Sequence, residues 1–322
     1  MAAVVAPLEA EAPEVLLAQP RGFCAGVARA IDIVEQALKL YGAPVYVFHE
    51  IVHNGYVVRD LASRGAIFVD DIESIPRGSV TVFSAHGVSD DVVSQARARH
   101  LEIIDATCPL VAKVHLQARQ YAASGYAIVM IGHPGHEEVE GTMGSAGAPV
   151  HLVSTPDDIE ALQVPPGSKV AYITQTTLSV DDTEELIRNL GARYPDIVGP
   201  ELDDICYATL NRQRAVRVLA EQVDLVLVVG ARNSSNSNRL REVASQSGVT
   251  AHLIEHAGEI EPQWLDGVRR IGVTAGASAP EILVTEVQER LRQLGAATAR
   301  EVPGVVERVT FRLPTLVKRA AS

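Results

Sequence analysis

Short, mostly apolar runs recur along the chain, and a polar turn follows most of them. They occupy residues 15–18, 45–48, 66–69, 80–83, 127–131, 170–173, 225–229 and 271–275. A run that stays apolar instead of alternating is typical of a strand buried on both faces, as in a parallel sheet. The segments between them carry apolar residues at helical spacing, as in Ala30, Val34, Ala37 and Leu38. The pattern predicts an α/β fold built on parallel sheets.

The chain has three cysteines, and each follows an extended segment and opens a predicted helix. Pro109 directly follows Cys108 and suits the first position of a helix. Backbone N–H groups at a helix start carry partial positive charge, which favours a thiolate over a thiol. We therefore expect thiolates at the three equivalent positions, Cys24, Cys108 and Cys206.

Two polar strand ends follow each cysteine at similar distances. The first lies 29, 28 and 28 positions after it, at His53, His136 and Ser234. The second lies 62, 68 and 72 positions after it, at His86, Thr176 and Ser278. Such a repeat predicts three similar αβα domains in a pseudo-threefold arrangement. The predicted divisions are a disordered N-terminal extension (1–14), three domains (15–107, 108–202, 203–296) and a C-terminal tail (297–322).

Composition excludes several classes of function. The net charge is −12, which speaks against nucleic acid as a partner, because binding to phosphate backbones needs clustered Lys and Arg. No apolar run reaches the length of a membrane span. An odd number of cysteines argues against a disulfide framework, and we expect a reducing cytoplasmic location.

Three thiolates converging on a pseudo-threefold axis suit either a zinc ion or an iron–sulfur cluster. Zinc with three protein ligands keeps an open position for water. A 4Fe-4S cluster normally takes four cysteines, so three leave one iron open. The close C-x-x-C pairs that are common in structural zinc sites are missing from the sequence, and this favours a cluster.

The polar strand ends supply many hydrogen-bond donors for a phosphate or diphosphate group. They include His53, His86, His136, Glu138, Thr176, Thr177, Ser234, Ser235, Asn236 and Ser278. Glu137 and Glu138 are adjacent, so we expect only one of them to face the site. A G-x-G-x-x-G fingerprint is missing, so no dinucleotide is predicted.

With these motifs in place, the sequence strongly resembles the 4-hydroxy-3-methylbut-2-enyl diphosphate reductases, iron–sulfur enzymes of the non-mevalonate isoprenoid pathway. The matching segments run in order along the chain. They include Pro-Arg-Gly-Phe-Cys-Ala-Gly (20–26), Glu-Ile-Val-His-Asn (50–54), Ser-Ala-His-Gly (84–87), Ala-Thr-Cys-Pro-Leu (106–110), Gln-Thr-Thr-Leu-Ser (175–179) and Asn-Ser-Ser-Asn-Ser-Asn-Arg (233–239). The sequence departs from the family pattern in its N-terminal extension, which carries no motif, and at Glu137, where Pro or another residue is expected.

The resemblance implies a 4Fe-4S cluster on Cys24, Cys108 and Cys206, with one iron open to the substrate hydroxyl. It implies a two-electron reductive dehydroxylation of the allylic diphosphate to isopentenyl and dimethylallyl diphosphate, with reduced ferredoxin or flavodoxin as donor. It also implies a tail that closes back on the first domain. Glu138 matches the proton donor, with His136 beside it, and Thr176 matches a position near the substrate hydroxyl. The diphosphate-binding positions match His53, His86, Ser234, Ser235, Asn236 and Ser278, with His136 also placed at the substrate.

Other readings remain open from the residues alone. A redox-neutral dehydratase would use the same three cysteines without an electron donor. An electron carrier or cluster-based sensor would normally saturate its cluster with four cysteines, and this chain has three. A zinc hydrolase would be colourless.

Overall fold

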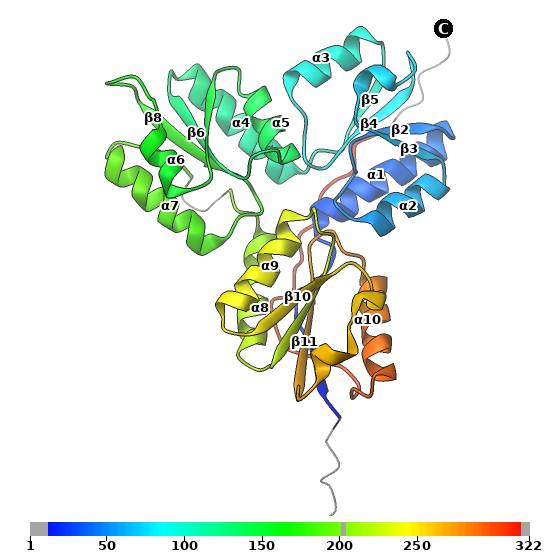
Figure 1. The fold of residues 1–322 in the computed structure, drawn as a ribbon. Helices are drawn as coiled ribbons and strands as arrows, with labels where there is room; N and C mark the ends of the chain where they lie inside the picture. Colours follow the sequence, from blue (N-terminus) through cyan, green and yellow to red (C-terminus); the bar gives the residue numbers. More distant parts are fainter. Residues whose placement is uncertain (1–11, 201–203, 317–322) are drawn as a thin grey trace, which may run out of the picture.

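The structure is a computed structural model that describes residues 12–200 and 204–316. In that part of the chain, three parallel sheets with their helices form three lobes around a common centre (Figure 1). This arrangement confirms the predicted α/β class with three similar αβα domains.

The first domain is built on a sheet with the strand order β3-β2-β4-β5. Apolar residues of its first helix, among them Ile33 and Val34, pack on Val47 and Val82 of the sheet. Its strands are β2 (Val45–Phe48), β3 (Ala66–Val69), β4 (Val80–Phe83) and β5 (Glu102–Asp105), and its helices are α1 (Ala25–Tyr41), α2 (Gly55–Ser63), the short η1 (Ile72–Ser74) and α3 (Asp90–Ala98).

The second domain has the strand order β7-β6-β8. Every residue of β8 is buried, as its unbroken apolar run predicts. The strands are β6 (Ala127–Ile131), β7 (Val150–Val153) and β8 (Val170–Thr174), and the helices are α4 (Pro109–Ala123), α5 (Glu137–Ser145), α6 (Pro156–Ala161) and α7 (Val180–Arg193).

The third domain has the strand order β10-β9-β11-β1-β12, so it contains both the first and the last strand of the described chain. Its strands are β1 (Glu14–Leu17), β9 (Leu225–Val229), β10 (Thr250–Ile254), β11 (Arg270–Ala275) and β12 (Arg300–Glu301). Its helices are α8 (Tyr207–Ala220), α9 (Ser235–Gln246), α10 (Glu281–Gln293) and the short η2 (Ala257–Glu259) and η3 (Pro262–Leu265).

The first strand corrects the predicted domain boundaries. Sequence order assigns residues 15–18 to the first domain, but β1 pairs with β11, with Leu17 opposite Val273. The backbone N–H and C=O groups of a buried strand need hydrogen-bond partners along its edges, and the third sheet provides β11 and β12. Glu14, assigned to the extension, already belongs to β1, and residues 1–11 of that predicted extension lie outside the described part.

The C-terminal tail is also only partly as expected. Within the tail, the sequence Val-Thr-Phe-Arg-Leu (309–313) predicts an edge strand. These residues form no strand in the described chain, and Val309 is exposed. The tail instead adds β12 beside β1 in the third domain. It then runs on to the first domain, where Arg29 Nε donates to Arg312 O at 3.0 Å and Leu316 packs against the core (Figure 1). The last predicted tail residues, 317–322, lie outside the described part.

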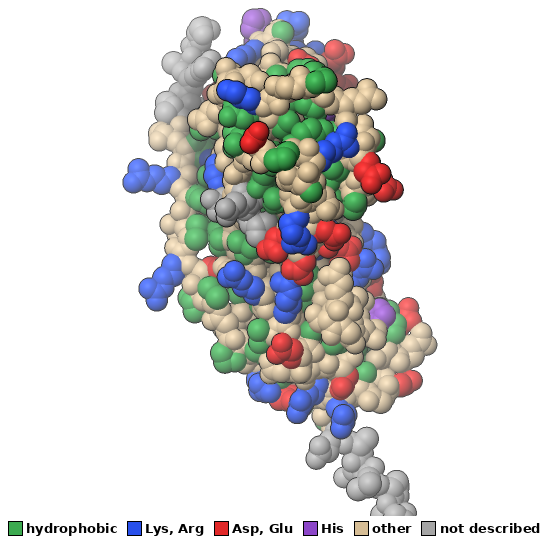
Figure 2. Space-filling view, turned by 90° about the vertical axis from the view of Figure 1, so that its left-hand side faces the viewer, with side chains coloured by type: hydrophobic (Ala, Val, Ile, Leu, Met, Phe, Trp, Pro, Cys, Tyr) green, Lys and Arg blue, Asp and Glu red, His purple; other side chains and the backbone are tan. Residues whose placement is uncertain are grey.

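Charges are mixed over the face shown in Figure 2, where acidic and basic side chains alternate between small apolar groups. On that face the excess of acidic residues is therefore not gathered into a single patch. Among the described residues, no helix combines the length and apolar character that crossing a membrane requires.

Candidate active site

Each cysteine lies where the chain passes from one domain into the next, as the last residue before a helix. Each backbone N–H donates to a carbonyl in the strand-end turn of the domain that the chain is leaving. The three hydrogen bonds are Cys24 N to Ala277 O (3.1 Å), Cys108 N to Ala85 O (2.9 Å) and Cys206 N to Thr176 O (3.1 Å). Each bond ties a cysteine to the strand-end turn of the preceding domain. The three cysteines therefore lie together where the three domains meet.

One cavity of about 100 Å³ collects the predicted site. All three cysteines line it, and so do all the candidate residues predicted at the polar strand ends: His53, His86, His136, Glu138, Thr176, Thr177, Ser234, Ser235, Asn236 and Ser278. His49 and His133 also follow apolar strands, each just before a histidine of the site, but they do not line this cavity.

Gly26 keeps space open between two of the sulfur atoms. A Cβ added to it would lie 2.7 Å from Cys108 Sγ and 3.8 Å from Cys24 Sγ. Only a glycine therefore leaves this space free beside the thiols. Three cysteines around an open space match a metal group that takes three protein thiolates and keeps one position free.

The thiols do not follow the expectation that helix ends favour thiolates. Burial raises the pKa of Cys108 to about 12 and that of Cys206 to about 11. Backbone N–H groups at the helix starts oppose this shift but do not overcome it. In the metal-free protein these thiols hold their protons, and metal binding has to release them.

Glu138 is the buried acid of the cavity, with 2% of its surface exposed. Its Oε1 accepts from Thr176 N at 2.6 Å, and its Oε2 accepts from Thr176 Oγ1 at 2.9 Å. Burial raises the pKa of Glu138 to about 7, although the two hydrogen bonds from Thr176 favour the charged form. The carboxyl group can therefore carry or release a proton near neutral pH.

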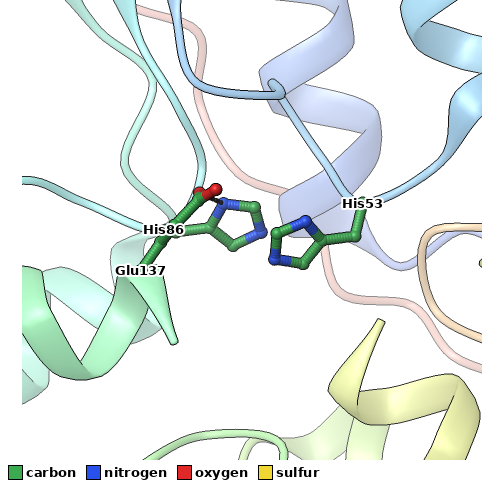
Figure 3. Close-up of side chains that lie close together, drawn as sticks. All are labelled: His53, His86 and Glu137. Carbon is green, nitrogen blue, oxygen red and sulfur yellow. Dashed lines mark ion pairs between the residues drawn. The ribbon is translucent and has the colours of Figure 1, made fainter. Parts of the chain in front are cut away.

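Three histidines from two domains form a second group in the cavity. The rings of His53 and His86 stack with centroids 4.1 Å apart, and the ring of His136 lies 5.5 Å from the first and 6.0 Å from the second (Figure 3 shows the stacked pair). Burial lowers the pKa of His136 to about 3 and also lowers the pKa of His86. An anionic ligand would reverse this tendency, because it favours the imidazolium form.

The third domain contributes hydroxyl and amide groups. Ser278 Oγ donates to His53 O at 2.9 Å and lies 3.4 Å from Ser234 Oγ, so it links this domain to the first. Asn236 Oδ1 accepts from Ala277 N at 2.8 Å. Ser235 Oγ accepts from Thr177 Oγ1 at 3.0 Å and links the second and third domains.

Three further helices have an N-cap that lines the cavity or directly follows a residue that lines it. Their N-caps are Asn54 before α2, His136 before α5 and Ser234 before α9, and each cap side chain accepts from a backbone N–H of its helix. Together with the cysteine-capped α1, α4 and α8, six helix N-termini point their partial positive charge at this region. The site therefore favours anionic ligands.

Sequence reasoning missed some residues at the site. Thr209 lines the cavity beside Cys206, and its spacing of three from that cysteine is the one signal in the sequence. Glu138 is the one member of the acidic pair that lines the cavity, as expected. Glu137 nevertheless reaches the site through His86, and Glu50 does so through His53.

Comparison with known proteins places the chain in a family. The family model described as LytB protein matches residues 15–292. The chain belongs to the LytB family. A Bordetella pertussis relative named 4-hydroxy-3-methylbut-2-enyl diphosphate reductase is 59% identical over 98% of this chain and 97% of its own length. One of the same name from Aromatoleum aromaticum is 59% identical over 94% of this chain and 96% of its own.

Solved structures of reductases share the fold of this LytB-family chain. The E-1-hydroxy-2-methyl-but-2-enyl-4-diphosphate reductase from Plasmodium falciparum matches with a TM-score of 0.89 and 39% identity, over 94% of this chain and 96% of that one. A second, described as (E)-4-hydroxy-3-methyl-but-2-enyl diphosphate reductase, the terminal enzyme of the non-mevalonate pathway, matches with a TM-score of 0.62 and 32% identity, over 87% of this chain and 99% of that one.

Proposed function

We propose that this LytB-family protein is a 4-hydroxy-3-methylbut-2-enyl diphosphate reductase, an oxidoreductase that completes the non-mevalonate pathway. One observation carries the proposal. Three cysteines, a buried acid and a set of anion-binding groups line a single cavity, in a chain that is 59% identical over 98% of its length to a protein of that name.

The reaction adds two electrons and two protons to the allylic diphosphate. The C–O bond of the hydroxyl group breaks, water leaves, and isopentenyl or dimethylallyl diphosphate forms. Cys24, Cys108 and Cys206 are the residues that would hold the cofactor, one 4Fe-4S cluster. Such a cluster, with one iron lacking a protein ligand, supplies electrons and a Lewis acid.

The substrate's diphosphate group is assigned to the histidines and the third-domain donors. Helix N-termini, hydroxyl groups and an amide surround that part of the cavity and bind phosphate oxygens well. The residues assigned to this role are His53, His86, His136, Ser234, Ser235, Asn236 and Ser278. They come from all three domains, so a bound diphosphate would connect the domains.

Glu138 is assigned as the proton donor, with Thr176 beside the substrate hydroxyl and His136 in support. Thr176 holds both carboxyl oxygens of Glu138, and Glu138 N donates to His136 Nδ1 at 3.1 Å. A carboxyl group whose pKa burial raises to about 7 is protonated often enough to act as an acid at neutral pH. Protonating the leaving oxygen releases it as water.

The electrons would come from reduced ferredoxin or flavodoxin, and the location would be the reducing cytoplasm. The odd cysteine count supports that compartment. The proposed partner is a small-molecule allylic diphosphate, and we expect neither nucleic acid nor a membrane as a partner.

The deciding experiment uses anaerobically purified protein. We expect a brown protein with about four irons per chain. It should consume a chemical reductant only when the allylic diphosphate is present, and it should release isopentenyl and dimethylallyl diphosphate. A colourless zinc protein would overturn the assignment. Loss of water from the substrate without reductant would instead indicate a redox-neutral dehydratase.

A single substitution tests the three-thiolate assignment. The Cys108→Ser variant should hold less than the full complement of iron and lose it readily, because one of three protein ligands is gone. Iron analysis and the visible spectrum measure this directly. A stable, complete cluster in that variant would contradict the proposed ligand set.

A further inference from the structure

In two of the cavity histidines, the ring nitrogen Nδ1 contacts a glutamate carboxylate. Glu137 Oε2 lies 2.7 Å from His86 Nδ1, and Glu50 Oε2 lies 3.2 Å from His53 Nδ1 (Figure 3 shows the first pair). The two pairs sit side by side, because the imidazole rings stack. Asn233 Nδ2 also donates to Glu50 Oε2 at 2.9 Å.

The contact with Glu137 is shielded from solvent. Its Oε2 is buried and meets His86 as a close ion pair, without an aligned hydrogen bond to any described residue. Of the Glu137 side chain 23% is exposed, against 14% for the His86 side chain. Glu137 is the first residue of α5, and Glu138, which follows it, turns to Thr176 instead. The two neighbouring acids therefore serve different partners.

The carboxylates fix what the histidines can offer to a ligand. A carboxylate accepts but does not donate, so it selects the tautomer with the hydrogen on Nδ1. Nε2 of a neutral ring is then an acceptor, as are all oxygens of an ionised diphosphate. The ring can bind diphosphate through Nε2 only after it takes up a second proton.

We propose that Glu137 is a positioning residue for substrate binding: it holds His86 through Nδ1 and enables that ring to take up a proton as the diphosphate binds. Glu50 acts on His53 in the same way, with Asn233 holding the carboxylate. This inference rests on the assignment of His53 and His86 to the diphosphate group.

The charges around His86 support this coupling. Burial and the neighbouring His53 lower the pKa of His86, and Glu137 and, from further away, Glu50 raise it. His136 is the third ring in the group. The free enzyme thus keeps His86 mostly neutral, and the added negative charge of a diphosphate shifts the balance to the imidazolium.

The test compares Glu137→Gln with Glu137→Asp and with Glu140→Gln as a matched control. Glu140 lies on the same helix but is exposed, so its replacement removes an equal charge without touching His86. The holoenzyme is used throughout, and each variant is first checked for wild-type iron content. Steady-state kinetics from pH 6 to 9 give KM and kcat for the allylic diphosphate.

We expect KM in Glu137→Gln to rise about tenfold, as for loss of a charge-assisted contact, with kcat changing less than KM. The pH above which KM rises should move downward, because the imidazolium has lost its carboxylate. Glu137→Asp should recover part of the affinity, and Glu140→Gln should match the wild type.

Calorimetry measures proton uptake on binding, which would stay unchanged if Glu137 had a purely structural role. Inorganic diphosphate is titrated into oxidised holoenzyme in two buffers of different ionisation enthalpy, which gives the number of protons taken up on binding. Glu137→Gln should take up fewer protons than the wild type. The ligand's own protons cancel in this difference.

Several outcomes would overturn the inference. Unchanged KM and proton uptake would make the contact incidental. A lower KM would mean that Glu137 merely repels the substrate. If added Mg²⁺ tightened diphosphate binding in the wild type but not in Glu137→Gln, that result would make Glu137 a metal ligand instead. His53, His86 and Glu137 offer ligand atoms within 4.8 Å of one another. Failure of the wild type to bind diphosphate or to consume reductant would instead reject the proposed function itself.

Discussion

The side chain of Glu138 combines a fixed position with an acidic proton. Both of its oxygens accept hydrogen bonds from Thr176. The amide of Gln can keep its carbonyl oxygen on Thr176 N, but it has no acidic proton. Replacing Glu138 by Gln therefore separates proton donation from shape.

We expect Glu138→Gln to keep its cluster and to bind substrate but to lose turnover by at least about 100-fold, the usual range for loss of a general acid. Substrate-induced changes in the visible spectrum report binding, and reductant consumption reports turnover. Glu140→Gln, on the exposed side of the same helix, is the control and should turn over normally. Wild-type turnover in Glu138→Gln would remove this residue from the mechanism.

The pH profile should show the same acid. Burial raises the pKa of Glu138 to about 7, and a bound anionic substrate disfavours the carboxylate further. The active, protonated form is present below that pKa and is lost as the pH rises through it. We therefore expect kcat at saturating substrate to fall about tenfold per pH unit above a break at or above pH 7. A kcat that stays constant up to pH 9 would contradict this role.

Much of the cavity could be predicted at the residue scale, because its groups stand at strand ends and helix starts. His86, Thr176 and Ser278 follow apolar runs whose ends are visible in the sequence. The carboxylates behind the histidines could not be predicted in this way. Whether Glu137 reaches His86 depends on side-chain direction across a domain boundary, which periodicity does not encode.

At the scale of elements, the first turn of α1 determines how close its domain can come to Cys108. The helix places Gly26 against two sulfur atoms, where any side chain would occupy the space of the proposed cluster. Glycine normally weakens a helix relative to alanine, so its presence in the first turn of α1 agrees with a need for close approach.

We expect Gly26→Ala to lower the iron content and the visible absorbance of the purified protein, because its Cβ would lie 2.7 Å from Cys108 Sγ. The matched control is Gly191→Ala in α7, where nothing lies within 4 Å of the added Cβ. That control should keep all its iron and gain up to about 1 kcal/mol in helix stability. Full iron and normal turnover in Gly26→Ala would show that the space beside the sulfurs is not needed.

The position of the first strand shows where sequence reasoning stops at the scale of the whole molecule. The run at residues 15–18 correctly predicts a buried strand. Its apolar pattern does not indicate which of the three sheets the strand joins. Val15 pairs with Ile271, and no local signal links positions so far apart. The chain consequently crosses between domains before Cys24 as well as before Cys108 and Cys206, and this completes the threefold centre.

Arg212 connects three distant segments of the molecule around that first crossing. It lies on α8 with its side chain fully buried. Its Nη2 donates to Gly22 O at 2.7 Å, and its Nη1 pairs with Glu307 Oε1 at 3.1 Å. The loop before Cys24, helix α8 and the C-terminal tail are therefore held by one guanidinium group.

Replacing Arg212 by Met should destabilise the protein by about 3–5 kcal/mol, because the mostly buried carboxylate of Glu307 and three backbone carbonyls lose their shared partner. Calorimetric melting of the holoenzyme measures the loss, which should appear as a lower Tm. Iron should also leave faster, since Gly22 and Phe23 directly precede Cys24 and both carbonyls accept from Arg212. Arg214→Met, exposed on the same helix, should change stability by no more than about 0.5 kcal/mol. If both variants melted like the wild type, the tail and the cysteine loop would have to be held by other contacts, and the threefold centre would not depend on this arginine.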